Sequence, residues 1–177
     1  MVYQGTFTIG LKENFRYNFF ITKRRMLATS GIVFVIILVL LAFFKSIYGQ
    51  VASIVDGFLY SLPMAAIGAV VLFLFSLGFM YIRLRSMYKK KAIDPFDQKV
   101  RLDNAGVHAT TAKGNIDLPW NKVGLIRESG SDFVIFVTDS IAYVLPKDQM
   151  KNPSEDVANI RAIFHKYMDN SKLHLKG

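Results

Sequence analysis

Two long apolar segments constrain this chain more than any other feature. Residues 26–44 and residues 57–82 contain no Asp, Glu, Lys, Arg or His. As a helix, the first would rise about 28 Å, close to the roughly 30 Å hydrocarbon thickness of a bilayer. The rest of the chain is too short to surround two helices that are apolar on every side. We therefore predict a transmembrane hairpin over residues 26–82, with spans at about 26–45 and 58–82.

A cleaved signal peptide explains the first segment poorly. A region of about twenty-five residues precedes the segment, and no small-x-small cleavage pattern follows it. A short connection, SIYGQVASIVDG, joins the two segments and is too small to form a domain. Both segments are expected to stay in the mature protein.

The positive charge of the chain is concentrated beside these segments. The net charge is +9, whereas residues 92–177 carry equal numbers of basic and acidic residues. This distribution argues against a nucleic-acid partner and predicts cytoplasmic termini by the positive-inside rule. The flanking cations are expected to set the orientation of the hairpin in the membrane. Two alternatives remain for them: they also bind anionic lipid headgroups, or they have no role beyond orientation. They are Lys23, Arg24, Arg25, Arg83, Arg85, Lys89, Lys90 and Lys91.

Ionisable groups inside a membrane usually mark ion paths, and neither span contains one. Transport by these two helices alone is therefore not expected. Small residues in the second span could instead let the two helices, or a second copy of the protein, approach closely. They are Ala65, Ala69, Ser76 and Gly78. The sequence is therefore compatible with a homo-oligomer.

The segments next to the spans are predicted separately. Within residues 1–25, TFTI (6–9) is a short strand that could extend a later sheet, and the chain continues as an amphipathic helix with Leu11, Phe15 and Phe19 on one side. That helix would either lie at the membrane interface, with Lys12 and Arg16 near headgroups, or pack on the soluble domain. Residues 83–98 are predicted to be a basic juxtamembrane linker.

After this linker the pattern changes to short β-rich runs and one helix. Asn152, Pro153 and Glu155 form a helix start signal before a stripe of apolar residues, namely Val157, Ile160, Phe164, Tyr167 and Met168. Turn residues, among them Lys113-Gly114 and Asp139-Ser140, separate the runs. We predict strands at 99–103, 106–111, 115–120, 122–128, 132–138 and 141–146, and a frayed tail at 171–177.

The chain offers little catalytic chemistry. It has no cysteine, its histidines His108, His165 and His174 are far apart, and no phosphate-binding glycine motif or nucleophile elbow is present. The pairs Asp94/Asp97 and Glu155/Asp156 lie in a predicted linker and in a first helical turn, where acids favour the helix dipole. We predict no enzyme activity, no cofactor and no metal.

A small bent antiparallel sheet capped by one C-terminal helix resembles the pleckstrin homology (PH) superfold. The order of two early spans, a basic stretch, D-N-A-G-V, I-D-L-P-W-N-K-V, A-Y-V-L-P-K and a terminal helix is similar to the bacterial YcxB-like family. Trp120, Leu145 and Pro146 are the fold signature, and Trp120 is expected in the core with its indole N–H bonded to a loop carbonyl. The resemblance implies an α+β protein with a PH-like β-barrel or sandwich at 99–170, facing the bacterial cytoplasm.

These features predict a non-catalytic protein of the bacterial cell membrane that binds a protein or an anionic lipid at the inner leaflet. Two other classes stay open. One is an immunity protein that neutralises a toxin at its membrane target, and the other is an accessory subunit of a transporter or membrane enzyme complex. The sequence does not identify the protein partner.

Overall fold

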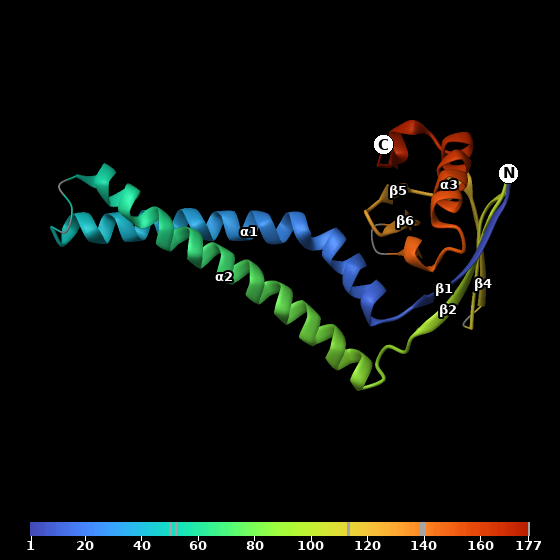
Figure 1. The fold of residues 1–177 in the computed structure, drawn as a ribbon, viewed down its shortest axis with the longest axis horizontal. Helices are drawn as coiled ribbons and strands as arrows, with labels where there is room; N and C mark the ends of the chain where they lie inside the picture. Colours follow the sequence, from blue (N-terminus) through green and yellow to red (C-terminus); the bar gives the residue numbers. More distant parts are fainter. Residues whose placement is uncertain (50, 52, 113, 139–140, 177) are drawn as a thin grey trace. The chain divides into compact units, whose positions relative to one another are not determined.

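A computed structural model describes residues 1–49, 51, 53–112, 114–138 and 141–176. The chain forms two compact units: Met1–Tyr17 together with Met87–Gly177, and Asn18–Ser86. The first contains the strands and the C-terminal helix, and the second contains most of two long helices (Figure 1). The α+β class predicted from the sequence is confirmed.

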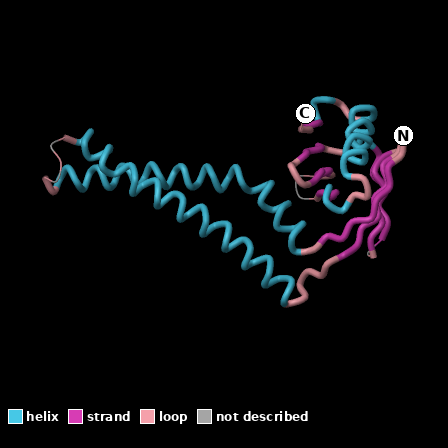
Figure 2. Tube along the Cα trace, viewed as in Figure 1, coloured by secondary structure: helices cyan, strands magenta, loops and turns pink. Residues whose placement is uncertain are grey.

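The two long helices form a hairpin (Figure 2). α1 runs from Leu11 to Ile47 and α2 from Ile54 to Lys89, and both are long and apolar enough to cross a membrane. Each extends beyond its predicted span, because the polar residues beside the span continue the helix. Gly49 follows the end of α1 with φ of 63°, the left-handed conformation that commonly terminates helices. In the connection, Gln50 and Ala52 lie outside the described residues.

Small residues bring the two helices together near their connection. Ala42, Gly57, Ser61 and Ala65 are buried there. A Cβ atom added to Gly57 would lie 2.8 Å from the carbonyl oxygen of Ala42, whereas one added to Gly78 would meet nothing within 4 Å. Ala65 therefore lies at the helix contact that the sequence suggested, while Gly78 points away from any described neighbour.

Replacing Gly57 by alanine is expected to destabilise the hairpin by about 1–3 kcal/mol, the usual cost of overpacking. The added methyl group would push the Ala42 backbone away. Gly78→Ala is the matched control, because it makes the same change in the same helix without a clash. Unfolding in detergent should separate the two variants, and equal stabilities would contradict the contact at Gly57.

The strands form two sheets of four. The first has the antiparallel order β1-β2-β3-β4, made of Tyr3–Ile9, Phe96–Leu102, Gly106–Thr111 and Gly114–Pro119. The second has the order β7-β6-β5-β8, made of Ala142–Pro146, Asp132–Phe136, Leu125–Glu128 and Leu173–His174. The described strands do not close into a barrel, so of the two expected forms, barrel or sandwich, the barrel is not found. The pairing stops between β4 and β5, where the 3₁₀ turn η1, Trp120–Lys122, interrupts the strand pattern.

The core lies between the two sheets and α3, Pro153–Tyr167. The predicted apolar stripe of this helix is confirmed: Ile160 and Phe164 are fully buried, and Phe164 meets the rings of Trp120 and Phe133 edge-on. The expected capping box differs. The Asn152 side chain caps no backbone N–H, and Asp156, not Glu155, accepts a hydrogen bond from the Asn152 N–H at 3.1 Å.

The C-terminal tail is ordered by a short helical turn and a strand. The tail was expected to fray, but η3, Asn170–Lys172, and β8 order it, and β8 pairs in parallel with β5. Two residues are too few to give a strand pattern in the sequence. The predicted turns at Lys113 and at Asp139-Ser140 lie outside the described residues.

The turn between β2 and β3 holds the tryptophan. Asp103 Oδ1 accepts hydrogen bonds from the N–H groups of Ala105 and Gly106, and the Trp120 indole N–H donates to Asp103 O at 2.8 Å. Gly106 has φ of 155°, and a Cβ there would lie 2.1 Å from Leu118 O. Only glycine fits this approach of β3 to β4.

Candidate functional site

The flanking cations lie on and just beyond the two long helices. Lys23, Arg24 and Arg25 belong to α1, Arg83, Arg85 and Lys89 to α2, and Lys90 and Lys91 to the turn that follows. Lys23 lies over the Phe20 ring with Nζ 5.0 Å from its centroid. Among the described residues, none of the eight forms an ion pair with an acidic side chain. Their charges remain available to an external anion.

Lys91 occupies a conformation that usually belongs to glycine. Its φ is 53°, and the N–H groups of Lys91 and Ala92 bond to the carbonyl groups of Tyr88 and Met87, which is the Schellman ending of a helix. A left-handed conformation at a residue with a side chain costs roughly 1–2 kcal/mol. The chain thus places a cation where glycine would be more stable.

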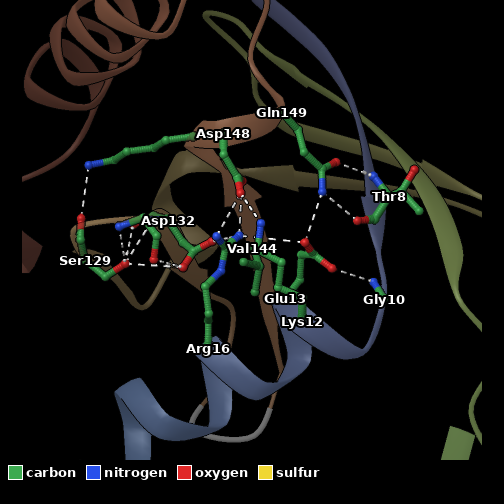
Figure 3. A network of polar contacts seen from close by, with 12 residues as sticks. Thr8, Gly10, Lys12, Glu13, Arg16, Ser129, Asp132, Val144, Asp148 and Gln149 are labelled. Carbon is green, nitrogen blue, oxygen red and sulfur yellow. Dashed lines mark hydrogen bonds and ion pairs between the residues drawn. The ribbon is translucent and has the colours of Figure 1, made fainter.

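The first turns of α1 are held to the β-rich unit by a second group of charges (Figure 3). Arg16 lies 2.9 Å from Asp132 Oδ1, at the start of β6, and donates to both oxygens of Asp148 in η2, Lys147–Gln149, at 3.0 and 3.2 Å. Lys12 reaches Asp148 Oδ2 at 2.7 Å. We call Lys12, Arg16, Asp132 and Asp148 the polar joint.

The carboxylate of Glu13 and the carboxamide of Gln149 make further contacts in this region. Glu13 accepts from the Gly10 N–H at 3.0 Å, which caps the start of α1. The Gln149 carboxamide accepts from the Thr8 N–H at 2.7 Å and donates to Thr8 O at 2.9 Å, as a neighbouring strand would (Figure 3). Residues 11–17 therefore pack on the β-rich unit, one of the two alternatives predicted for this helix, and Lys12 and Arg16 are paired with carboxylates there.

The two carboxylates of the polar joint differ in their electrostatics. Burial raises the pKa of Asp132 above its usual value, and the hydrogen bond from Ser131 and the charge of Arg16 only partly oppose this. The hydrogen bond from Arg16, opposed by partial burial and supported by Lys12, lowers the pKa of Asp148 to about 2. The Asp132 side chain is 4% exposed and the Asp148 side chain 41%. Arg16 thus neutralises one buried and one exposed acid.

A buried carboxylate, Glu128, ties the tail and α3 to the second sheet. It accepts from Arg161 Nε and Nη2 at 2.9 and 2.7 Å, from the Lys176 N–H at 3.1 Å, and from Lys147 Nζ. Burial would raise the pKa of Glu128, but these donors together lower it. Its side chain is fully buried, so the group is a structural cross-link.

The outer face of the first sheet carries a histidine between two acids. The His108 ring nitrogens lie 2.5 Å from Asp117 Oδ1 and 3.1 Å from Asp103 Oδ1, and Arg101 pairs with Asp103 at 3.0 Å. The hydrogen bond to Asp117, opposed by partial burial and supported by Asp103, raises the pKa of His108. This cluster cannot be predicted from the sequence pattern, because its members come from four separate positions on β2, β3, β4 and a turn.

In the described ranges, no three His, Asp or Glu side chains form a group that could hold a metal ion. The Ser129 hydroxyl bonds to backbone and carboxylate groups of Asp132. The predictions that the protein has no enzyme activity, cofactor or metal stay predictions.

The fold signature residues lie in the β-rich unit. Trp120 and Leu145 are buried in the core, and Pro146 ends β7 before η2. The polar joint and the Glu128 cluster were missed from the sequence. Only the charges of their members were visible, and nothing in the pattern pairs residue 16 with residues 132 and 148.

Comparison with known proteins identifies one family. The family model described as YcxB-like protein matches residues 102–163, which confirms the resemblance predicted for this part of the chain. The match includes β3 to β7 and most of α3, but neither long helix. The searches of curated proteins and of solved structures return no match.

Proposed function

We propose that this chain, in which residues 102–163 form a YcxB-like domain, is a membrane-anchored adaptor without catalytic activity. α1 and α2 span the bacterial cell membrane, both termini are cytoplasmic, and the β-rich unit is a PH-like domain that binds a protein partner at the inner leaflet. Anchoring raises the effective concentration of that partner at the membrane.

The observation that carries this proposal is a contrast between two sets of cations. Lys12 and Arg16, which pack on the β-rich unit, are both paired with carboxylates. The eight flanking cations, which lie beside the apolar segments, have no acidic partner among the described residues. Unpaired cations at the ends of apolar helices are typical of side chains that face anionic headgroups.

The β-rich unit supports the adaptor role in a different way. Two of its buried acids, Glu128 and Asp132, have cationic neighbours inside the unit, and these contacts tie the start of α1 and the tail to the sheets. A domain that is tied together by such contacts and carried on a membrane anchor can present surfaces for binding. The PH-like assignment rests on the sheet order with a closing C-terminal helix and on the sequence resemblance.

Neutralising three flanking cations should weaken lipid selection. In the full chain in nanodiscs of equal phosphatidylglycerol and phosphatidylcholine, Lys89→Gln/Lys90→Gln/Lys91→Gln is expected to lose most of the preference for phosphatidylglycerol. Each cation near an anionic surface contributes about 1 kcal/mol. Native mass spectrometry of the ejected protein–lipid complexes measures the ratio of the two retained lipids.

The matched control removes three cations from the β-rich unit, in Lys122→Gln/Lys166→Gln/Lys172→Gln. These lysines are distant in sequence from both long helices. The control should keep the lipid preference of the wild type. If both triple variants behave alike, or if the first keeps its preference, the flanking cations do not select anionic lipid.

A further inference from the structure

The edge of β1 that faces away from β2 is only partly covered. Thr8 uses both its N–H and its C=O to bind the Gln149 carboxamide, so these groups point away from β2. Backbone groups alternate along a strand, and residues at even spacing from Thr8 direct theirs to the same side. Those residues are Thr6 and Gln4, for which no hydrogen bond on that side is found among the described residues.

A cavity of about 500 Å³ lies along this open edge. Tyr3, Gln4, Gly5 and Thr6 form one side, and residues 149–152, which are the last residue of η2 and the chain that leads to α3, form much of the other. We call this cavity the β1 slot. The volume is within the range of pockets that hold small ligands or a few residues of peptide.

The sequence of β1 does not protect this edge. Natural edge strands usually carry lysine, proline or a bulge that prevents pairing with other chains. YQGTFTI contains no charge and no proline, and it pairs with β2 without interruption in register over Tyr3–Ile9. Gln149 covers only Thr8. An edge left open for two outward-facing residues, beside a cavity, can accept one more strand.

We propose that the β1 slot binds an extended segment of a partner protein, which adds as a strand to β1 through the N–H and C=O groups of Gln4 and Thr6. This identifies the partner surface of the adaptor and rests on the proposed function in that respect. Main-chain pairing of this kind gives affinity, and the side chains around the slot give specificity.

The charges around the slot indicate which segment fits. Lys151 lines the slot, and its side chain is exposed and forms no ion pair within the described part of the chain. Asp156, also at the slot, already accepts the Asn152 N–H. An acidic residue in the added strand would complement Lys151.

The shape of the slot favours a single segment over a second copy of this protein. In a symmetric dimer through β1, each edge would have to approach the other past residues 149–152 of both copies. An extended segment of a partner protein has to pass residues 149–152 of only one molecule. A dimer is therefore an outcome that would overturn the proposal.

The test uses the full chain in nanodiscs and a phage-displayed library of random heptapeptides. Selected peptides are expected to carry an acidic residue and to slow amide hydrogen exchange at Gln4 and Thr6 by about tenfold or more, while Thr8, already bonded, changes little.

Three variants test the same pairing. Thr6→Pro removes the outward N–H and should weaken binding about tenfold. The variant should still fold, since edge strands tolerate proline. Thr6→Val keeps the N–H and should bind as the wild type does. Lys151→Glu should weaken binding of the acidic peptides.

Three results would overturn the proposal. Selected peptides could bind Thr6→Pro as well as the wild type, or no selected peptide could protect Gln4 and Thr6, or those amides could already be protected in the free protein in a concentration-dependent way, as in a dimer. The exchange measurement needs no variant, so it decides the matter even if Thr6→Pro fails to fold. None of these results affects the lipid or topology experiments, which test the anchor itself.

Discussion

Glu128→Gln is expected to lower the free energy of unfolding of the β-rich unit by about 3–5 kcal/mol, the cost of removing one partner from a buried ion pair. The Glu128 carboxylate receives donors from Arg161, Lys147 and the Lys176 backbone. Glutamine would leave the two cations without their counter-charge and would place an amide group against them. Chemical unfolding of the full chain in detergent measures the loss.

The matched control is Glu155→Gln, at an exposed position in the first turn of α3. Its loss should be below about 1 kcal/mol, since it removes an exposed charge that favours the helix dipole, and the glutamine oxygen can still accept the 3.4 Å hydrogen bond from Asn152 Nδ2. The variant at Glu128 should also release the tail, because the Lys176 N–H and β8 depend on it. Amide exchange in residues 173–176 would then increase, and unchanged exchange there would contradict the cross-link.

The effect of Glu128 should depend on pH in a defined direction. Its pKa in the folded protein is below the ordinary value of 4.5. A group with a lowered folded pKa stabilises the protein above its unfolded pKa, and this contribution is lost as the pH falls through the folded pKa. The stability difference between wild type and Glu128→Gln should therefore be full at neutral pH and shrink below about pH 4.5. A difference that stays constant down to pH 3 would argue against an ionised Glu128.

Arg16→Ala is expected to destabilise the β-rich unit by about 2–3 kcal/mol, somewhat less than a fully buried pair because the Arg16 side chain is 20% exposed. Asp132, which is 4% exposed, would lose its cation and would take up a proton more readily, since burial already raises its pKa. Thermal unfolding together with amide exchange over residues 11–17 measures the effect.

Lys12→Ala is the control for the polar joint. Lys12 pairs with the same acid, Asp148, but its side chain is 68% exposed, and exposed ion pairs contribute about 0–1 kcal/mol. The loss should also shrink in high salt for Lys12→Ala and persist for Arg16→Ala, because buried pairs are screened less. Equal losses in the two variants would contradict the role assigned to Asp132.

The sequence predicts the secondary structure of this protein well and its charge pairing poorly. The strands over residues 106–111, 132–136 and 142–146 follow from alternation and turn residues, and α3 follows from its start signal and apolar stripe. These signals are local. The two long helices follow from composition alone, although their true ends lie beyond the apolar residues.

The polar joint shows why the rest could not be predicted. Arg16 was visible as a cation on an amphipathic helix, and this pattern fits a membrane interface as well as a protein surface. Its partners, Asp132 and Asp148, lie more than a hundred residues away, and only the tertiary fold brings them together. The Gln149 contact with Thr8 and the open edge beyond it are hidden for the same reason.

The central claim is that α1 and α2 cross the membrane and leave the β-rich unit in the cytoplasm. Because the chain has no cysteine, single cysteines can be introduced and labelled without background. In intact cells, a membrane-impermeant maleimide should label Ser53→Cys, in the connection between the helices, and should label Ser171→Cys only after lysis. Labelling of Ser171→Cys in intact cells, with Ser53→Cys protected until lysis, would contradict this topology.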